Sequence, residues 1–350
     1  MVPSILSLLM NKFLKKLVEN DCKLNGFNNN QEIIEQGLAP VLAISNPSTT
    51  LLKANLLEQS KYLNWQEKAI ILFENFYKQN IKFLVLKGFA YSYLLYDQSH
   101  IRPYSDIDIF VHESDYDRAE KILIQLGYKK FQSRQGQFIS YQNSFYDNNK
   151  IQATIDLHWQ INNRIEFHQY FQFDQLIQTA IVIESPLMHF KTLNIIDAFI
   201  LACCHYIGHR SEDRKHIWLY DLALLWHNMG CEIQKQAIQV AQQRQQSQII
   251  HSVLNLLKSN FNNCIDANTF KTNAFENSQE YLHNRTNKVN DLKIKLKSIQ
   301  GTKNKIKFIS EYIFQSKNYV RNRYKLKSKT WVYLYYPRMW IEDSIKLFKK

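Results

Sequence analysis

Residues 102–111 read RPYSDIDIFV, and this run places Asp106 and Asp108 one residue apart within an apolar segment. The alternation and the β-branched residues predict a strand over residues 106–111. Side chains at positions i and i+2 of a strand project from the same face, so both carboxylates are expected to point the same way. Two like charges on one buried face are costly unless a cation compensates them. The run therefore predicts a divalent metal site beside a sheet.

A third carboxylate lies on a later predicted strand, residues 151–161 (IQATIDLHWQI). Asp156 and His158 share one face of this strand, and a lone carboxylate in its middle is costly to bury. We expect Asp106, Asp108 and Asp156 to lie together and to hold one or two Mg²⁺ ions, which would bridge the phosphates of a nucleoside triphosphate. His158 is expected either to contact this site or to be a hydrogen-bonded structural histidine.

Two further positions are candidates for phosphate binding. Lys87 and Gly88 follow the apolar run 81–86 and precede a predicted helix, where backbone N–H groups can meet a phosphate. Lys87 would bind a phosphate or form an ion pair with an aspartate. Arg102, four residues before Asp106, would contact the triphosphate or remain a surface-loop arginine.

The rest of the sequence predicts alternating helices and strands followed by a helical half. We expect strands over residues 81–86, 106–111 and 151–161, a hairpin within 131–146, and helices over 65–79, 89–96 and 114–127, the last capped by Ser114 and ended by Gly127. From about residue 171 onward the pattern is helical, most clearly over 193–205 and 216–227.

Positive charge is concentrated in the last 66 residues. Residues 285–350 carry 18 Lys and Arg against 4 Asp and Glu, whereas the rest of the chain carries 26 against 27. Such a segment attracts RNA, anionic lipid or an acidic partner, and the other interpretation is a solvated helical face. Residues 331–348 (WVYLYYPRMWIEDSIKLF) combine aromatic residues with basic ones, which suits a helix on an anionic membrane surface or docking against the body of the protein. Residues 287–350 are thus the expected contact for RNA or a membrane.

The cysteines and the start of the chain indicate the compartment. None of the 5 cysteines has metal-ligand spacing, and nothing suggests a disulfide framework, so a reducing compartment is expected. The first residues are apolar, but Lys12, Lys15 and Lys16 follow without a cleavage site, which favours an amphipathic helix over a signal peptide. No apolar run reaches transmembrane length. We expect a cytoplasmic protein, with peripheral contact at the inner membrane face as a further expectation.

These motifs resemble the DNA-polymerase-β-like nucleotidyltransferase superfamily. Its signature of a Gly-containing turn, Asp-x-Asp between apolar residues and a later acidic residue corresponds here to Lys87-Gly88, Asp106-Ile107-Asp108 and Ile155-Asp156-Leu157. More narrowly, the segments LKGFAYSYLLY, RPYSDIDIFV, AEKILIQLGY and IDLHWQI are similar to an uncharacterised bacterial nucleotidyltransferase family and to the nucleotidyltransferase toxins of abortive-infection systems. The resemblance covers roughly residues 30–230.

The resemblance implies an α/β (α+β) fold with a mixed sheet, followed by a mainly helical C-terminal region. It also implies Mg²⁺-dependent transfer of a nucleoside monophosphate from an NTP such as ATP to the hydroxyl of an unknown acceptor, a small molecule or a protein. By the same resemblance, Asp106 and Asp108 would hold the metal ions, and Asp156 would bind one ion and deprotonate the acceptor. Gly88 would let the chain approach the triphosphate.

One position departs from the family pattern. The superfamily often has a second Gly or Ser after the first Gly, whereas this chain has Phe89. Phosphate binding by a hydroxyl at that position is therefore in question, and Ser105 is a substitute contact.

Other functions and sites remain open. The alternatives are a tRNA-modifying nucleotidyltransferase toxin, which the basic tail would favour, and a non-catalytic nucleotide-binding protein, which the intact carboxylate triad argues against. His205, His209 and His216 approach zinc-ligand spacing but lack a convincing further ligand, and His205 and His209 are more simply explained as lining the substrate cleft. Asp221 is expected to accept a hydrogen bond inside the core.

We divide the chain into five expected parts. These are an N-terminal helical segment (1–63), the nucleotidyltransferase domain (64–170), a helical domain (171–260), a linker (261–286) and a basic, aromatic-rich C-terminal segment (287–350).

Overall fold

The computed structural model describes residues 12–27, 29–45, 47–131, 136, 138–147, 154–162, 165–209, 211–262, 265, 288–326 and 331–348. At its centre is a five-stranded mixed sheet of order β1-β2-β5-β4-β3. The strands are β1 (Phe83–Leu86), β2 (Asp106–Val111), β3 (Lys129–Lys130), β4 (Gln142–Tyr146) and β5 (Thr154–His158). β2 and β5 run parallel, and the other neighbouring strands are antiparallel.

The sheet confirms most of the predicted strands. β2 has the predicted bounds, β1 lies within the predicted strand, and β3 pairs with β4 near the predicted hairpin. β5 confirms the middle of the strand predicted over 151–161, of which residues 151–153 lie outside the described residues. The apolar residues of β1 are all buried, as expected for a strand covered on both faces.

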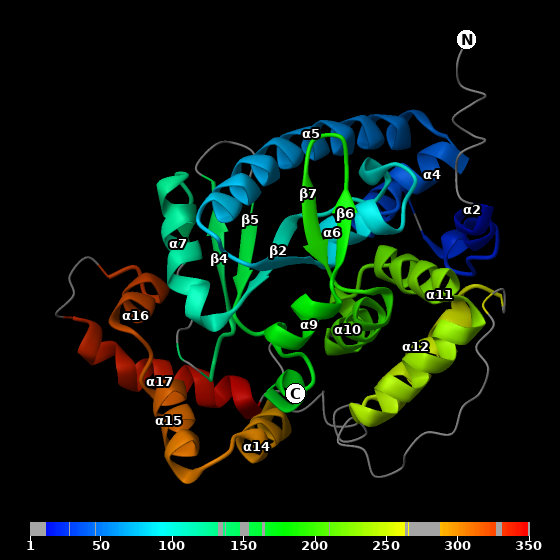
Figure 1. Cartoon of the computed structure of the whole chain (residues 1–350). Coiled ribbons are helices and arrows are strands. Elements are labelled where there is room, and N and C mark those ends of the chain that lie inside the picture. Colours follow the sequence, from blue (N-terminus) through cyan, green and yellow to red (C-terminus); the bar gives the residue numbers. More distant parts are fainter. Residues whose placement is uncertain are drawn as a thin grey trace.

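Helices cover both faces of the sheet (Figure 1). α5 (Thr49–Lys78) extends along it, followed in the chain by α6 (Lys87–Leu94) and α7 (Tyr116–Gln125). α5 begins after Ser48, whose side chain accepts a hydrogen bond from the Leu51 amide. The helix predicted over 65–79 is therefore only the second half of a 30-residue helix, and the expected boundary at residue 63 lies inside it.

Two local expectations were wrong. Ser114 does not cap α7, because a 3₁₀ turn over Glu113–Asp115 comes first, although the chain does leave the helix at Gly127 with φ +89°. The helical expectation beyond residue 171 missed a hairpin of β6 (Ile181–Glu184) and β7 (His189–Thr192). β7 pairs antiparallel with β6 and packs beside β1, where the Thr192 hydroxyl donates to the Val85 carbonyl oxygen (2.7 Å).

The second half of the core is helical, as expected. It contains α8 (Ile165–His168), α9 (Phe173–Thr179), α10 (Ile195–Gly208), α11 (Ile217–Gln243) and α12 (Ser247–Asn260), joined by the N-terminal helices α2 (Lys12–Glu19), α3 (Asn30–Glu35) and α4 (Ala39–Ser45). α11 continues well beyond the predicted 216–227 and kinks at Gly230, whose φ is +63°. Short 3₁₀ turns occupy Leu24–Gly26, Ser99–Ile101 and Ser211–Asp213.

The basic tail forms α14 (Lys288–Ser298), α15 (Thr302–Ile313), α16 (Lys317–Arg323) and α17 (Val332–Phe348), grouped together in Figure 1. Val320, Val332 and Met339 form a small core of its own. Most of the predicted linker lies outside the described residues. Among the helices that are described, none is long and apolar enough to cross a membrane.

Candidate active site

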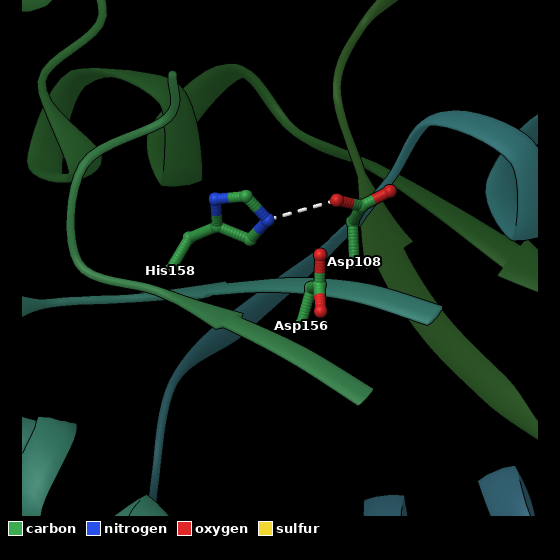
Figure 2. Close-up of side chains that lie close together, drawn as sticks. All are labelled: Asp108, Asp156 and His158. Atoms are coloured by element: carbon green, nitrogen blue, oxygen red, sulfur yellow. Dashed lines mark hydrogen bonds and ion pairs between the residues drawn. The ribbon is translucent and has the colours of Figure 1, made fainter. Parts of the chain in front are cut away.

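Asp108 and Asp156 lie opposite each other on the parallel strands β2 and β5. Both are almost fully buried, with 5% and 9% of their surface exposed. His158, two residues further along β5, points to the same place (Figure 2). The three residues each offer a ligand atom, and these atoms lie within 4.8 Å of one another. The predicted sharing of a face by Asp156 and His158 is confirmed.

Asp108 is held by two nitrogen groups. The Lys87 ammonium donates to its Oδ1 (2.7 Å), and His158 Nε2 lies 2.8 Å from the same oxygen. Burial alone would raise the pKa of Asp108, but Lys87 and His158 together hold this pKa well below its usual value. Burial would likewise lower the pKa of Lys87, and the Asp108 carboxylate raises it instead. Asp108 and Lys87 are therefore both charged.

Lys87 is also unusual in its backbone. It is the first residue of α6, directly after β1, and its φ is +51°. A non-glycine residue in this left-handed region is strained, and such strain clusters at functional sites. An ion pair with an aspartate was one of the two roles expected for Lys87, and the structure shows this ion pair with Asp108.

Asp156 is only partly satisfied. Gln142 of β4 donates to its Oδ2 (2.7 Å), whereas its buried Oδ1 has no hydrogen-bond partner. An unpartnered buried carboxylate oxygen is costly, and a bound cation would remove that cost. Gln142 was not predicted, because nothing in the local sequence shows that a glutamine will reach a carboxylate on the neighbouring strand.

Asp106 opens β2 and is partly exposed. Burial, then repulsion by Asp108, raises the pKa of Asp106 to about 7. Its carboxylate is not in the close group formed by Asp108, Asp156 and His158, while Ser105 Oγ lies 3.4 Å from its Oδ1. The neighbourhood is thus short of positive charge, and its oxygen donors fit a hard divalent cation such as Mg²⁺.

The carboxylates open onto a cleft of about 1150 Å³. Its lining comes from the sheet, α6, α10 and α11, with further residues from α3, α5 and α14. The lining includes every residue predicted for the site, namely Lys87, Gly88, Arg102, Ser105, Asp106, Asp108 and Asp156. Lys61 of α5, Lys215 and Lys295 of α14 also line it and were not predicted.

Arg102 is buried rather than on a surface loop. Its guanidinium makes an ion pair with Asp221 of α11 (2.6 Å), and its Nη1 donates to the Pro103 carbonyl oxygen (2.6 Å). A Cβ on Gly88 would lie 2.5 Å from Arg102 Nη1. Glycine is therefore needed at position 88 to admit the guanidinium. The core hydrogen bond expected for Asp221 is confirmed, and its donors are Arg102 and Tyr96.

The three histidines separate into two places. His205 of α10 and His209, the residue after this helix, line the cleft with their Nε2 atoms 3.2 Å apart, and both rings contact Trp218. Burial, then the nearby Lys87, lowers the pKa of His205 well below its usual value, so its ring is neutral. His216 lies elsewhere, bonded to the buried Asp21 (2.6 Å).

Comparison with known proteins identifies similar sequences and folds. Residues 35–262 match a family model described as uncharacterised nucleotidyltransferase. A search of curated proteins finds no match to this chain.

The similar solved structures include the following three. The antibiotic-resistance factor ANT(2'')-Ia aligns with a TM-score of 0.38 and 12% identity, over 53% of this chain and 98% of its own. The lincomycin-bound lincosamide antibiotic adenylyltransferase LnuA gives 0.33 and 13%, over 45% and 94%. An antigenic nucleotidyltransferase-like protein from Paracoccidioides brasiliensis gives 0.33 and 12%, over 57% and 97%. At TM-scores this low, the alignments convey nothing about the substrate of this chain.

Proposed function

The chain belongs to the uncharacterised nucleotidyltransferase family, and from that premise we propose that it transfers a nucleoside monophosphate from an NTP to a hydroxyl group with the help of Mg²⁺. Asp106, Asp108 and Asp156 are the proposed metal-binding carboxylates. The acceptor is proposed to be a small molecule or a protein.

One observation carries the proposal. Asp108 and Asp156 face each other on parallel strands at the wall of the cleft, and the Oδ1 atom of Asp156 is buried without a partner. A purely structural site would satisfy that oxygen, since buried polar groups are normally hydrogen-bonded. A site that binds and releases a metal ion leaves this Asp156 oxygen available to the ion.

The residues have separable roles in the reaction. Mg²⁺, when bound, neutralises phosphate charge and positions the reacting oxygens. Asp108 remains ionised and would offer a carboxylate oxygen to the metal ion. Lys87 and His158 fix the orientation of this carboxylate. Asp156 accepts the proton of the acceptor hydroxyl, with Gln142 holding its other oxygen.

In the transfer, the acceptor oxygen forms a bond to the α-phosphorus, and the bond from that phosphorus to the bridging oxygen breaks. Pyrophosphate leaves with the electron pair of the broken bond. The cleft is large enough for both a nucleotide and an acceptor. The proposed phosphate-binding side of the cleft is the start of α6 with Gly88, together with Ser105. The proposed acceptor-binding side is the face that carries His205, His209 and Trp218.

The test is transfer of label from α-³²P-labelled ATP, CTP, GTP or UTP. The full chain is incubated with Mg²⁺ and each nucleotide, alone, with total tRNA, or with a metabolite extract. Asp108→Asn and Asp156→Asn are expected to lower transfer at least roughly 10²-fold. Asp213→Asn, a change of an exposed carboxylate outside the cleft, is the matched control and should retain wild-type transfer.

The acceptor classes give different outcomes. Label on the protein or on a small molecule supports the proposal, whereas label on RNA identifies the tRNA-modifying alternative. Undiminished transfer by the Asp108→Asn and Asp156→Asn variants would show that these carboxylates are not the metal-binding site.

A further inference from the structure

The tail helices carry an apolar surface that stays exposed among the residues that the structure describes. We call it the tail patch, formed by Ile309, Ile313, Phe314, Trp340, Ile341 and Ile345. The two helices that carry it, α15 and α17, contact each other at Ile313, Phe314 and Trp340. The Trp340 indole N–H donates to the Ile313 carbonyl oxygen (2.7 Å), and the Phe314 and Trp340 rings lie edge to face with centroids 5.6 Å apart.

The spacing of these side chains is helical. Ile309 and Ile313 are four residues apart on α15, as are Ile341 and Ile345 on α17, so each pair lies on one face of its helix. All four are exposed, because the tail packs its inner faces around a small core of its own. Contiguous exposed apolar surface of this kind marks an interaction site.

The tail that carries the patch is mostly positive, with 18 Lys and Arg against 4 Asp and Glu over residues 285–350. Three of the four acidic residues of the tail are hydrogen-bonded or ion-paired, either within the tail or with the rest of the protein. Glu342 accepts hydrogen bonds from Arg323 and Arg338, Asp343 pairs with Arg323, and Glu311 accepts from the Phe138 amide. Exposed lysines of the tail include Lys293, Lys303 and Lys325.

We propose that the tail patch binds the surface of an anionic lipid bilayer. Isoleucine, phenylalanine and tryptophan gain free energy by entering the boundary between headgroups and acyl chains, and lysines gain from anionic headgroups. Nucleic acid offers no apolar layer for the isoleucines, since its recognition relies on phosphate contacts and base stacking. A second copy of this chain would bring together two tails that each carry 18 basic and 4 acidic residues, and they would repel each other.

The test uses the full chain and vesicles, without nucleotide, so its outcome is independent of the proposed catalytic activity. Co-sedimentation is measured with phosphatidylcholine vesicles that contain or lack phosphatidylglycerol. Binding is expected only with phosphatidylglycerol and should weaken as salt concentration rises. The double variant Phe314→Ser/Ile341→Ser should lower the partition coefficient about tenfold or more.

Matched controls come from α5. Leu56 is 63% exposed and Ile341 is 62% exposed, so Leu56→Ser removes a similarly exposed apolar side chain outside the tail and should leave binding unchanged. Lys303→Glu and Lys325→Glu should each weaken binding roughly fivefold, whereas Lys53→Glu should not. Circular dichroism checks that the variants remain folded.

A second measurement uses the unaltered protein. Lipids brominated on their acyl chains should quench part of the tryptophan fluorescence, and Trp340→Phe should reduce the quenched fraction. Equal binding to neutral vesicles, no binding at all, or binding of tRNA without vesicle binding would each overturn the proposal.

Discussion

Arg102 and Asp221 form a buried ion pair that joins the loop before β2 to α11, across 119 positions of sequence. Arg102 Nη2 and Nε both reach Asp221 Oδ2, and the Tyr96 hydroxyl donates to Asp221 Oδ1 (2.9 Å). Arg102 is also the neighbour that requires glycine at position 88. One contact therefore connects the helical half of the chain to the edge of the sheet that carries the carboxylates.

Removing one partner of this pair should destabilise the fold. Asp221→Asn leaves the guanidinium buried without a counter-charge, and the free energy of unfolding should fall by about 3–5 kcal/mol. Urea denaturation measures it. Glu232→Gln removes a carboxylate whose pair with Lys235 is exposed, and this control should leave the unfolding midpoint unchanged. Similar losses of unfolding free energy in the two variants would show that the buried pair stabilises the fold no more than an exposed pair does.

Gly88→Ala should impair the site while Gly26→Ala should not. A Cβ at position 88 would lie 2.5 Å from Arg102 Nη1 and 3.2 Å from Tyr104 Cβ, whereas a Cβ at position 26 meets nothing within 4 Å. Because Asp221 and the Pro103 carbonyl hold the guanidinium, it cannot move aside cheaply. We expect Gly88→Ala to cost about 1–3 kcal/mol of stability, measured by urea denaturation, and to lower label transfer. A fully active Gly88→Ala protein would refute the tight packing.

The pKa of Asp106 makes stability depend on pH. Burial, then Asp108, raises this pKa from 3.8 to about 7. Between these values the native state holds a proton that the unfolded state has lost, so stability should fall as pH rises through this range. Asp106→Asn should flatten that part of the profile of melting temperature against pH. A profile that keeps its slope in this variant would assign the titration to another group.

The same charge balance predicts how divalent ions act. Above pH 7 Asp106 is ionised, and Mg²⁺ or Mn²⁺ should raise the melting temperature because the ion binds the native carboxylates. At pH 5 Asp106 is protonated, and the increase should be smaller. Differential scanning fluorimetry with and without a chelator measures both. An equal increase at the two pH values would exclude Asp106 from the metal-binding site.

Lys87→Met tests whether the Lys87 ammonium competes with a cation at Asp108 or orients the Asp108 carboxylate for it. The ammonium lies 2.7 Å from Asp108 Oδ1 and competes with any cation at that oxygen. If competition dominates, Mn²⁺ without nucleotide should bind the variant at least as tightly as the wild type, measured by calorimetry. Lys87→Arg keeps the charge and is the control. Weaker Mn²⁺ binding by Lys87→Met would show that Lys87 organises Asp108 more than it competes.

Local pattern was sufficient for much of the fold. β2 has the predicted bounds, and Asp156 and His158 share a face because side-chain alternation is a property of the strand itself. The β6–β7 hairpin was missed because β6 alternates only between exposed and half-buried positions. The helical segment expected over residues 1–63 and the helix expected over 65–79 join within α5, so the boundary placed at residue 63 was wrong.

The sequence by itself determined the chemistry available to this protein, since it specified which carboxylates alternate on which strand and where the positive charge accumulates. Only the tertiary structure decided their partners: Gln142 for Asp156, His158 for Asp108, and Asp221 for Arg102. The physical reason is the difference in the sequence range of the interactions involved. Strand alternation depends on adjacent residues, whereas strand register and the position of α11 depend on how the whole apolar core is buried, which no short segment specifies.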